Sequence, residues 1–140
     1  MATTLAEAWE LSRSDRGLAI VSTLRADQTI QTSLVNTGVV GDQLAFVTYG
    51  PVKLANLRAR PQIAVAFRDG WRWAAVEGRA ELAGPDDPRP GLDAEGLRLL
   101  LREIFTAAGG THDNWDEYDR TMRDQRRAAV LITPTRVYGS

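Results

Sequence analysis

Strand-like segments follow one another through tight turns along much of the chain, and this order restricts the fold more than any other feature. Gly41-Asp42 and Asp69-Gly70 are turn signals flanked on both sides by segments of β-branched, aromatic or apolar residues. Consecutive strands joined by hairpins form antiparallel sheets or small barrels, whereas doubly wound parallel sheets alternate strands with helices. We therefore expect a mainly β (α+β) fold with an antiparallel sheet or small barrel and helices at its margins.

The pattern predicts six strands and four helices. Strands are expected at residues 18–24, 30–39, 44–48, 62–67, 71–82 and 128–133. Helices are expected at residues 4–15, 52–58, 93–108 and 115–124, with Thr4, Asp93 and Asn114 as candidate N-caps. Pro51 suits the first position of the second helix, and residues 84–91, rich in proline and aspartate, predict a surface loop.

Composition limits the class of protein further. A chain of 140 residues, 44% hydrophobic and 25% charged, has room for one core, so we treat residues 1–140 as a single domain. No stretch reaches the roughly 18 apolar residues of a membrane span, and the first residues lack a signal-peptide pattern, so we expect a cytoplasmic protein. Without cysteine and with His112 as the single histidine, no metal site, disulfide or Ser–His–Asp triad is expected.

The basic residues contain one exception. Lys53 is the only lysine beside sixteen arginines, and residues 43–68 carry four cations and no acid. Such a local positive field favours an anionic partner. Four cations in 26 residues are sparse for nucleic acid, so a small phosphorylated or carboxylated ligand fits better.

Lys53 falls in the first turn of the helix expected after Thr48-Tyr49-Gly50-Pro51. A helix N-terminus presents unpaired backbone N–H groups and partial positive charge, which together bind anions. Thr48 could add a hydroxyl to such a site. The alternative is that Lys53 extends into solvent and Thr48 only ends a strand.

Two further groups are candidates. Trp71 and Trp73 are expected on one face of a strand, where they could pack on a ring cofactor, on a dimer partner or, as is usual, inside the protein. Ser33 and Asn36 lie within the second strand, either on its wet face or against a ring edge. Arg126-Arg127 could bind carboxylates, although a solvated helix end is the favoured interpretation.

Several segments together resemble a known family. The sequence from Lys53 to Pro61 resembles the K-x-x-N-L-R-x-x-P helix of the pyridoxamine-5′-phosphate-oxidase-like split β-barrel superfamily, and Val76-Glu77-Gly78 resembles a strand of its next hairpin. Residues 110–118, with Met122, Arg126-Arg127 and residues 137–139, resemble the actinobacterial branch that uses the deazaflavin coenzyme F-420. The resemblance covers nearly the whole chain.

The resemblance implies a six-stranded split barrel and a homodimer with two cofactor sites at the subunit interface. Lys53 and Thr48 would hold the cofactor phosphate, Ser33 and Asn36 would lie under or beside the ring, and the tryptophans would reach across from the partner. Pro51 stands where related proteins often have a second cation, a role that Arg58 or Arg60 could take. The expected cofactor-binding positions are Lys53, Thr48, Pro51, Ser33, Asn36, Asn56, Arg58, Trp71 and Trp73.

The activity implied by the resemblance is F-420-dependent reduction of an electron-poor small molecule such as an enone, a quinone or a tetrapyrrole-like compound. In such enzymes the cofactor carries the chemistry and the protein positions the reactants, and no catalytic residue is assigned here. One alternative is an FMN-binding oxidoreductase of the same fold. Another is a protein that binds the cofactor without turnover.

Overall fold

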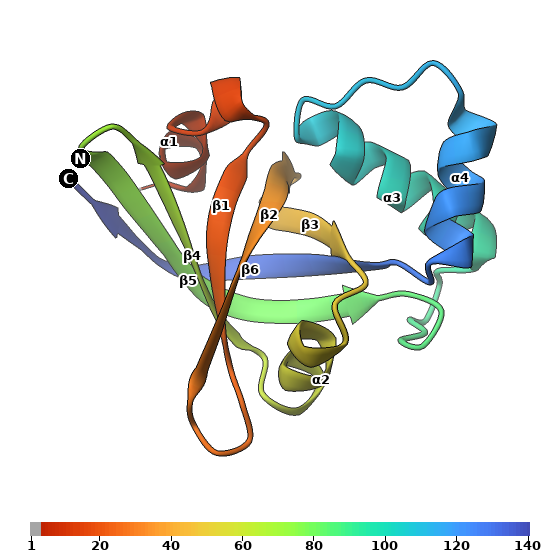
Figure 1. Ribbon diagram of the computed structural model, residues 1–140, viewed down its shortest axis with the longest axis horizontal. Helices are drawn as coiled ribbons and strands as arrows, with labels where there is room; N and C mark the ends of the chain where they lie inside the picture. The colour runs from red at the N-terminus through yellow and green to blue at the C-terminus, as the bar shows by residue number, and fades with distance from the viewer. Residues whose placement is uncertain (1–3) are drawn as a thin grey trace.

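A closed antiparallel barrel forms the body of the protein. The computed structural model describes residues 4–140, so the first three residues of the expected domain lie outside it. Within that range six strands close in the order β1-β2-β3-β6-β5-β4 (Figure 1). The strands are β1 Leu18–Leu24, β2 Ile30–Val40, β3 Gln43–Thr48, β4 Gln62–Asp69, β5 Arg72–Ala83 and β6 Ala128–Gly139. The prediction of a mainly β barrel with peripheral helices is confirmed.

Tight turns join the hairpins as the sequence predicts. Gly41 and Gly70 adopt φ angles of 62° and 63°, in the left-handed region that glycine enters without steric cost. Each therefore reverses the chain between neighbouring strands, β2 to β3 and β4 to β5. The long segment between β5 and β6 carries two helices, and β6 then enters between β3 and β5 to complete the barrel.

The first helix packs against the barrel core. Helix α1 covers Leu5–Glu10, and a short 3-10 helix, η1, follows at Arg13–Asp15, so the predicted single helix at 4–15 is interrupted. The interruption turns the chain into β1, with the Gly17 amide donating to the Ser12 carbonyl at 2.8 Å. On the buried side of α1, the indole nitrogen of Trp9 donates to the carbonyl of Thr37 at 3.0 Å. This bond ties the helix to β2.

Two helices lie together beside the barrel (Figure 1). They are α3 Ala94–Ala107 and α4 Trp115–Asp124, and the side chains of Asp93 and Asn114 cap them as predicted. Leu101 and Ile104 of α3 pack in a second apolar cluster with small residues of the barrel wall. The approach is close, because a Cβ on Gly38 would lie 2.7 Å from Ala107.

The last strand is longer than predicted. The sequence places it at residues 128–133, before Pro134, whereas β6 runs to Gly139. A register shift between Glu77 and Gly78 of β5 accommodates the proline, which lies opposite Gly78. Proline is tolerated in a sheet at such irregularities because no ladder hydrogen bond from its nitrogen is required.

Helix α2, Pro51–Ala59, connects β3 to β4 and packs against β1 and β5. Its first turn lies directly after the end of β3 and positions the candidate site. Within residues 4–140 no helix is long and apolar enough to cross a membrane.

Candidate anion-binding site

The start of α2 has no side-chain cap. Gly50 occupies the N-cap position without a capping hydrogen bond, and Pro51 follows at the first helical position. The first backbone N–H groups of a helix have no partner within the helix, and the macrodipole adds partial positive charge at this end. Gly50 donates its own amide to the Thr48 hydroxyl at 3.1 Å, which fixes the turn between β3 and α2.

Lys53 is buried in this first turn, with 6% of its surface exposed. Its ammonium nitrogen lies 3.4 Å from the hydroxyl oxygen of Thr48 and 5.5 Å from the centre of the Phe46 ring. Burial alone lowers the pKa of Lys53, and no carboxylate among the described residues pairs with it. The interpretation that Lys53 extends into solvent is therefore wrong, and the site holds a positive charge without a counter-ion.

Phe46 was not anticipated as part of the site. The alternation of β3 indicates that Phe46 and Thr48 share a face of the strand. Nothing local in the sequence indicates that Lys53 folds back over that face. The contact depends on how α2 packs against the strand, which is a tertiary property.

Ser33 and Asn36 do not form one surface. They lie three residues apart on β2, so the strand alternation directs them to opposite faces. The Ser33 hydroxyl oxygen is buried and has no hydrogen-bond partner within residues 4–140. The Asn36 amide is exposed and donates to the carbonyl of Arg16 at 3.2 Å. Of the two, only Ser33 offers an unused buried polar atom.

Asn56 is buried and has a structural partner. Its amide nitrogen donates to the Thr23 hydroxyl at 3.0 Å, and Thr23 donates in turn to the side-chain oxygen of Gln31 at 3.1 Å. This short chain of hydrogen bonds fastens α2 to β1 and β2. Asn56 therefore supports the helix that carries Lys53.

The two arginines at the end of α2 are also engaged elsewhere. Arg58 forms a bidentate ion pair with Asp87 in the loop after β5, at 2.7 and 2.8 Å, and this pairing raises the pKa of Arg58. Arg60 donates to the carbonyl of Leu24 at 3.0 Å. Arg58 is therefore not free to replace the cation missing at Pro51, and Arg60 is held at Leu24 by its Nε.

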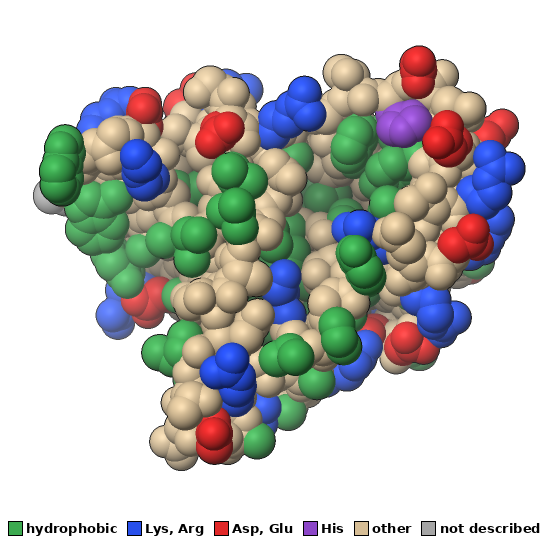
Figure 2. Space-filling model, in the orientation of Figure 1, with side chains coloured by type: hydrophobic (Ala, Val, Ile, Leu, Met, Phe, Trp, Pro, Cys, Tyr) green, Lys and Arg blue, Asp and Glu red, His purple; other side chains and the backbone are tan. Residues whose placement is uncertain are grey.

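The two tryptophans lie at the surface, and the expectation that they pack inside the protein is wrong. Trp71 belongs to the hairpin turn before β5 and is 97% exposed. Trp73 is 44% exposed and meets the Tyr138 ring edge-on, with 6.2 Å between ring centres. Figure 2 shows hydrophobic side chains gathered at this end of the molecule, where β4 meets β5 and the chain ends.

Arg126 is exposed at the end of α4, in line with the favoured interpretation of a solvated helix end, whereas Arg127 is half-buried. Arg126 pairs with Asp86 at 2.5 Å. The guanidinium of Arg127 stacks on the Tyr49 ring, 4.1 Å from its centre, so the segment before β6 touches the turn that precedes α2. His112 is a loop residue as predicted, and its Nδ1 accepts from the Asn114 amide at 3.0 Å. Among the described residues no three potential metal-ligating side chains gather.

Comparison with known proteins supports the fold. No family model matches the chain. A conserved hypothetical protein from Mycobacterium tuberculosis is similar over 99% of this chain and 85% of that chain, with 19% identity and a TM-score of 0.73. An F-420 reductase matches over 86% and 88%, with 20% identity and a TM-score of 0.62.

A third solved structure is a pyridoxamine 5′-phosphate oxidase-related, FMN-binding protein from Nostoc punctiforme. It matches over 95% of this chain and 80% of that chain, with 15% identity and a TM-score of 0.65. At such identities the likeness shows the fold alone. It is the fold of the pyridoxamine-5′-phosphate-oxidase-like barrels, as the sequence resemblance implied.

Proposed function

We propose that this chain, which has the fold of the pyridoxamine-5′-phosphate-oxidase-like barrels, is an oxidoreductase that binds the deazaflavin coenzyme F-420 at the start of α2. The observation that carries the proposal is the buried ammonium of Lys53, which has no carboxylate partner. A buried unpaired charge is costly. A bound phosphate would supply the missing counter-ion and would also face the N-terminus of α2.

The residues present fit a phosphate-bearing ring cofactor. Lys53 offers three N–H donors, the Thr48 hydroxyl can donate, and the first amides of α2 have no side-chain cap. Asn56 holds α2 against β1, so that Lys53 stays in place.

F-420, when bound, supplies a hydride for the reduction of an electron-poor double bond. The chain contributes binding, orientation and exclusion of water, which together lower the barrier to such a transfer. We assign no proton donor within the chain. An electron-poor small molecule such as an enone, a quinone or a tetrapyrrole-like compound is the proposed substrate class.

We further propose that the protein acts as a homodimer. A row of outward-facing side chains crosses five strands, because the register pairs Leu34 with Ile20, Ile20 with Ala66, Ala66 with Ala75, and Ala75 with Tyr138. Leu34, Ile20 and Tyr138 are large and exposed. A continuous apolar row of this kind is typical of a surface that a second copy covers.

Two alternative functions can be distinguished from this proposal by experiment. FMN also carries a phosphate, and an FMN-binding protein of the same fold is among the solved structures similar to this chain. A protein that binds F-420 without turnover would use the same phosphate contacts. Protein that purifies with an FMN spectrum would favour the first alternative, and F-420 binding without oxidation of the reduced cofactor by any acceptor would favour the second.

Fluorescence titration of the purified protein with F-420, beside a parallel titration with FMN, tests the proposal. We expect saturable F-420 binding, weakened by about 1–3 kcal/mol in Lys53→Gln because a charged contact is lost. Arg68→Gln is the matched control, since Arg68 is an exposed cation of the same acid-free segment. No binding at tens of micromolar, or equal binding by Lys53→Gln, contradicts the proposal.

A further inference from the structure

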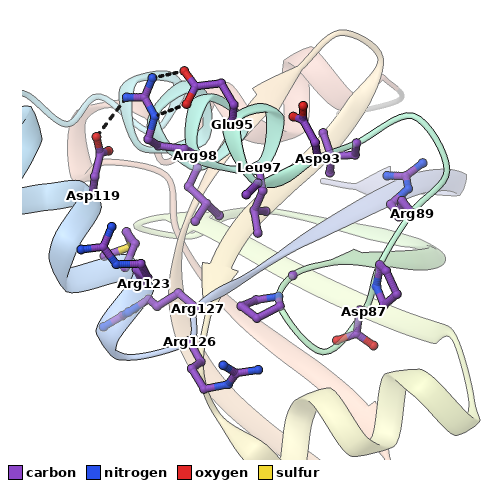
Figure 3. Close-up of a pocket in the computed structure, with 17 residues that line it drawn as sticks. Asp87, Arg89, Asp93, Glu95, Leu97, Arg98, Asp119, Arg123, Arg126 and Arg127 are labelled. Carbon is purple, nitrogen blue, oxygen red and sulfur yellow. Dashed lines mark hydrogen bonds and ion pairs between the residues drawn. The ribbon is translucent and has the colours of Figure 1, made fainter.

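A cavity lies between the loop after β5, helix α3 and the end of α4. Its volume is about 560 Å³. Pockets of roughly 300–1,000 Å³ are the usual size for small-molecule ligands. Figure 3 shows Leu97 pointing into the cavity from α3, with Arg89 on one side and Arg126 below.

The lining is apolar apart from its charged rim. Leu97 and Leu101 contribute from α3, Met122 from α4, and Pro85 and Leu92 from the loop. Leu101 belongs to the buried cluster between the helices and the barrel, and Leu97, Leu92 and Met122 pack partly buried against it. The cavity therefore has a fixed apolar wall that can accept a hydrocarbon chain or a ring.

Most of the charges around this cavity neutralise one another. Arg89 pairs with Glu81, Arg126 pairs with Asp86, and Arg98 pairs with Glu95 and Asp119. Asp87 is bound by Arg58, and the Asp93 carboxylate caps α3. Among the lining carboxylates that the structure describes, Asp93 alone has no cation partner.

Two lining arginines have no carboxylate. Arg123 makes no ion pair within the described part of the chain, and Arg127 donates from Nε to the Gln125 side chain at 2.8 Å. Arg127 is also held by stacking on Tyr49, so its orientation is fixed while its terminal nitrogens remain unbonded within residues 4–140. The cavity thus combines an apolar wall with two uncompensated guanidinium groups on the α4 side.

We propose that this cavity binds an amphipathic carboxylate, an apolar chain or ring carrying one acid group. The forked N–H donors of arginine match a carboxylate bidentately, and the leucines, methionine and proline cover the apolar part. The lining contains none of Lys53, Thr48 or Ser33, and it adjoins the anion site at Arg127, which stacks on Tyr49 in the turn before α2.

Decanoate is a suitable probe, because it joins one carboxylate to a flexible apolar chain. We expect isothermal titration to give saturable one-site binding with a Kd below about 1 mM. Decanol, which lacks the charge, binds at least about tenfold more weakly if arginine contacts contribute as proposed. Absence of saturable decanoate binding, or equal affinity for decanol, overturns the proposal.

Three variants locate the binding. The double variant Arg123→Gln/Arg127→Gln weakens decanoate binding by about tenfold or more, and Leu97→Trp fills the cavity and abolishes it. Arg120→Gln is the matched control on α4, since Arg120 is exposed and does not line the cavity. Unchanged affinity in the double variant, with a native circular dichroism spectrum, contradicts the site.

Lys53→Gln separates the two proposals. This variant binds decanoate as the parent does if the cavity is the site, and loses binding if decanoate occupies the anion site at α2 instead. Amide chemical shifts provide a readout that needs no variant, with changes expected in residues 84–101 and 119–127. Changes centred on residues 48–53 would overturn the cavity site.

Discussion

The ammonium nitrogen of Lys53 lies 3.4 Å from the hydroxyl oxygen of Thr48, and this contact with a neutral group is the only hydrogen bond of the Lys53 side chain within residues 4–140. A hydroxyl group is polar but uncharged, so the charge of the Lys53 ammonium stays uncompensated beneath the surface of the folded protein. The buried cation destabilises the free protein and stabilises a complex with an anion. Measurements of stability with and without an anion therefore separate the two effects.

Lys53→Met separates the two effects. Methionine keeps the apolar length of the side chain and removes the buried charge, so we expect the free protein to become more stable by about 1–3 kcal/mol. Inorganic pyrophosphate should stabilise the parent protein and leave the variant unchanged. Urea unfolding with and without pyrophosphate measures both. A variant that is less stable than the parent without anion contradicts the proposed imbalance.

The same residue gives the anion site a pH dependence. Burial lowers the pKa of Lys53 below its ordinary value of 10.5. Between the lowered pKa and 10.5 the unfolded chain holds a proton that the folded chain has lost, so this residue makes stability rise with pH in that window. Anion affinity should fall over the same window as the ammonium loses its charge.

The comparison with Lys53→Met isolates this contribution. Burial raises the pKa of Tyr118 to about 12, so that tyrosine lowers stability as pH rises above its ordinary value of 10. Tyr118 acts equally in parent and variant, and its effect cancels in the difference between them. A difference that is independent of pH up to 10.5 would rule out the assigned role of burial.

Asn56→Ala tests the support of α2. The change leaves the buried Thr23 hydroxyl without its donor and removes the tie between α2 and β1, so we expect a loss of about 1–3 kcal/mol in the free energy of unfolding. Asn36→Ala, on the exposed face of β2, should cost less than about 0.5 kcal/mol. Equal losses in the two variants would remove the structural role given to Asn56.

Asp119 connects the two helices beside the barrel. Its carboxylate accepts from Arg102 and Arg98 of α3, and these bonds hold its pKa below the ordinary value. Asp119→Asn should therefore cost about 1–2 kcal/mol, and the stability it provides should be lost as pH falls through the lowered pKa. Glu95→Gln is the control, because Glu95 is more exposed. Thermal unfolding at several pH values provides the measurement.

A charge in the outward row across the barrel tests the dimer. Ile20→Asp places a carboxylate at the middle of the row formed with Leu34 and Ala66, which an interface cannot bury without cost. Sedimentation should give a dimer for the parent and a monomer for this variant. Leu99→Asp, an equally exposed leucine on α3, should leave the dimer intact. A parent that sediments as a monomer would end the proposal of a homodimer.

Local signals in the sequence predict most of the elements. The strand at 18–24 and the helix at 115–124 have the predicted bounds, because β-branched content and a capping asparagine act over a few residues. The extension of β6 past Pro134 was not predictable, since it depends on a shifted register in β5, a distant partner.

Contacts between residues that are distant in sequence also determine which side chains are free at the candidate site. The helix start and Lys53 follow from Gly50 and Pro51, but the engagement of Arg58 by Asp87 depends on a loop 29 residues later. Trp73 likewise meets Tyr138 of β6, a strand that is distant in sequence. Sequence pattern thus predicts which residues are unusual, and tertiary packing decides what each one touches.

Because sixteen of the seventeen basic side chains are arginine, the chain has a single ε-amine, and that amine is shielded. Reagents that acylate amines meet one internal target besides the terminal α-amine, so intact-mass spectrometry can count its modification without peptide mapping once the α-amine is blocked. The extent of acylation then reports directly on how often the first turn of α2 opens to solvent. A ligand that covers Lys53 would slow the acylation in proportion to the fraction of protein that it occupies. The ligand itself needs no label.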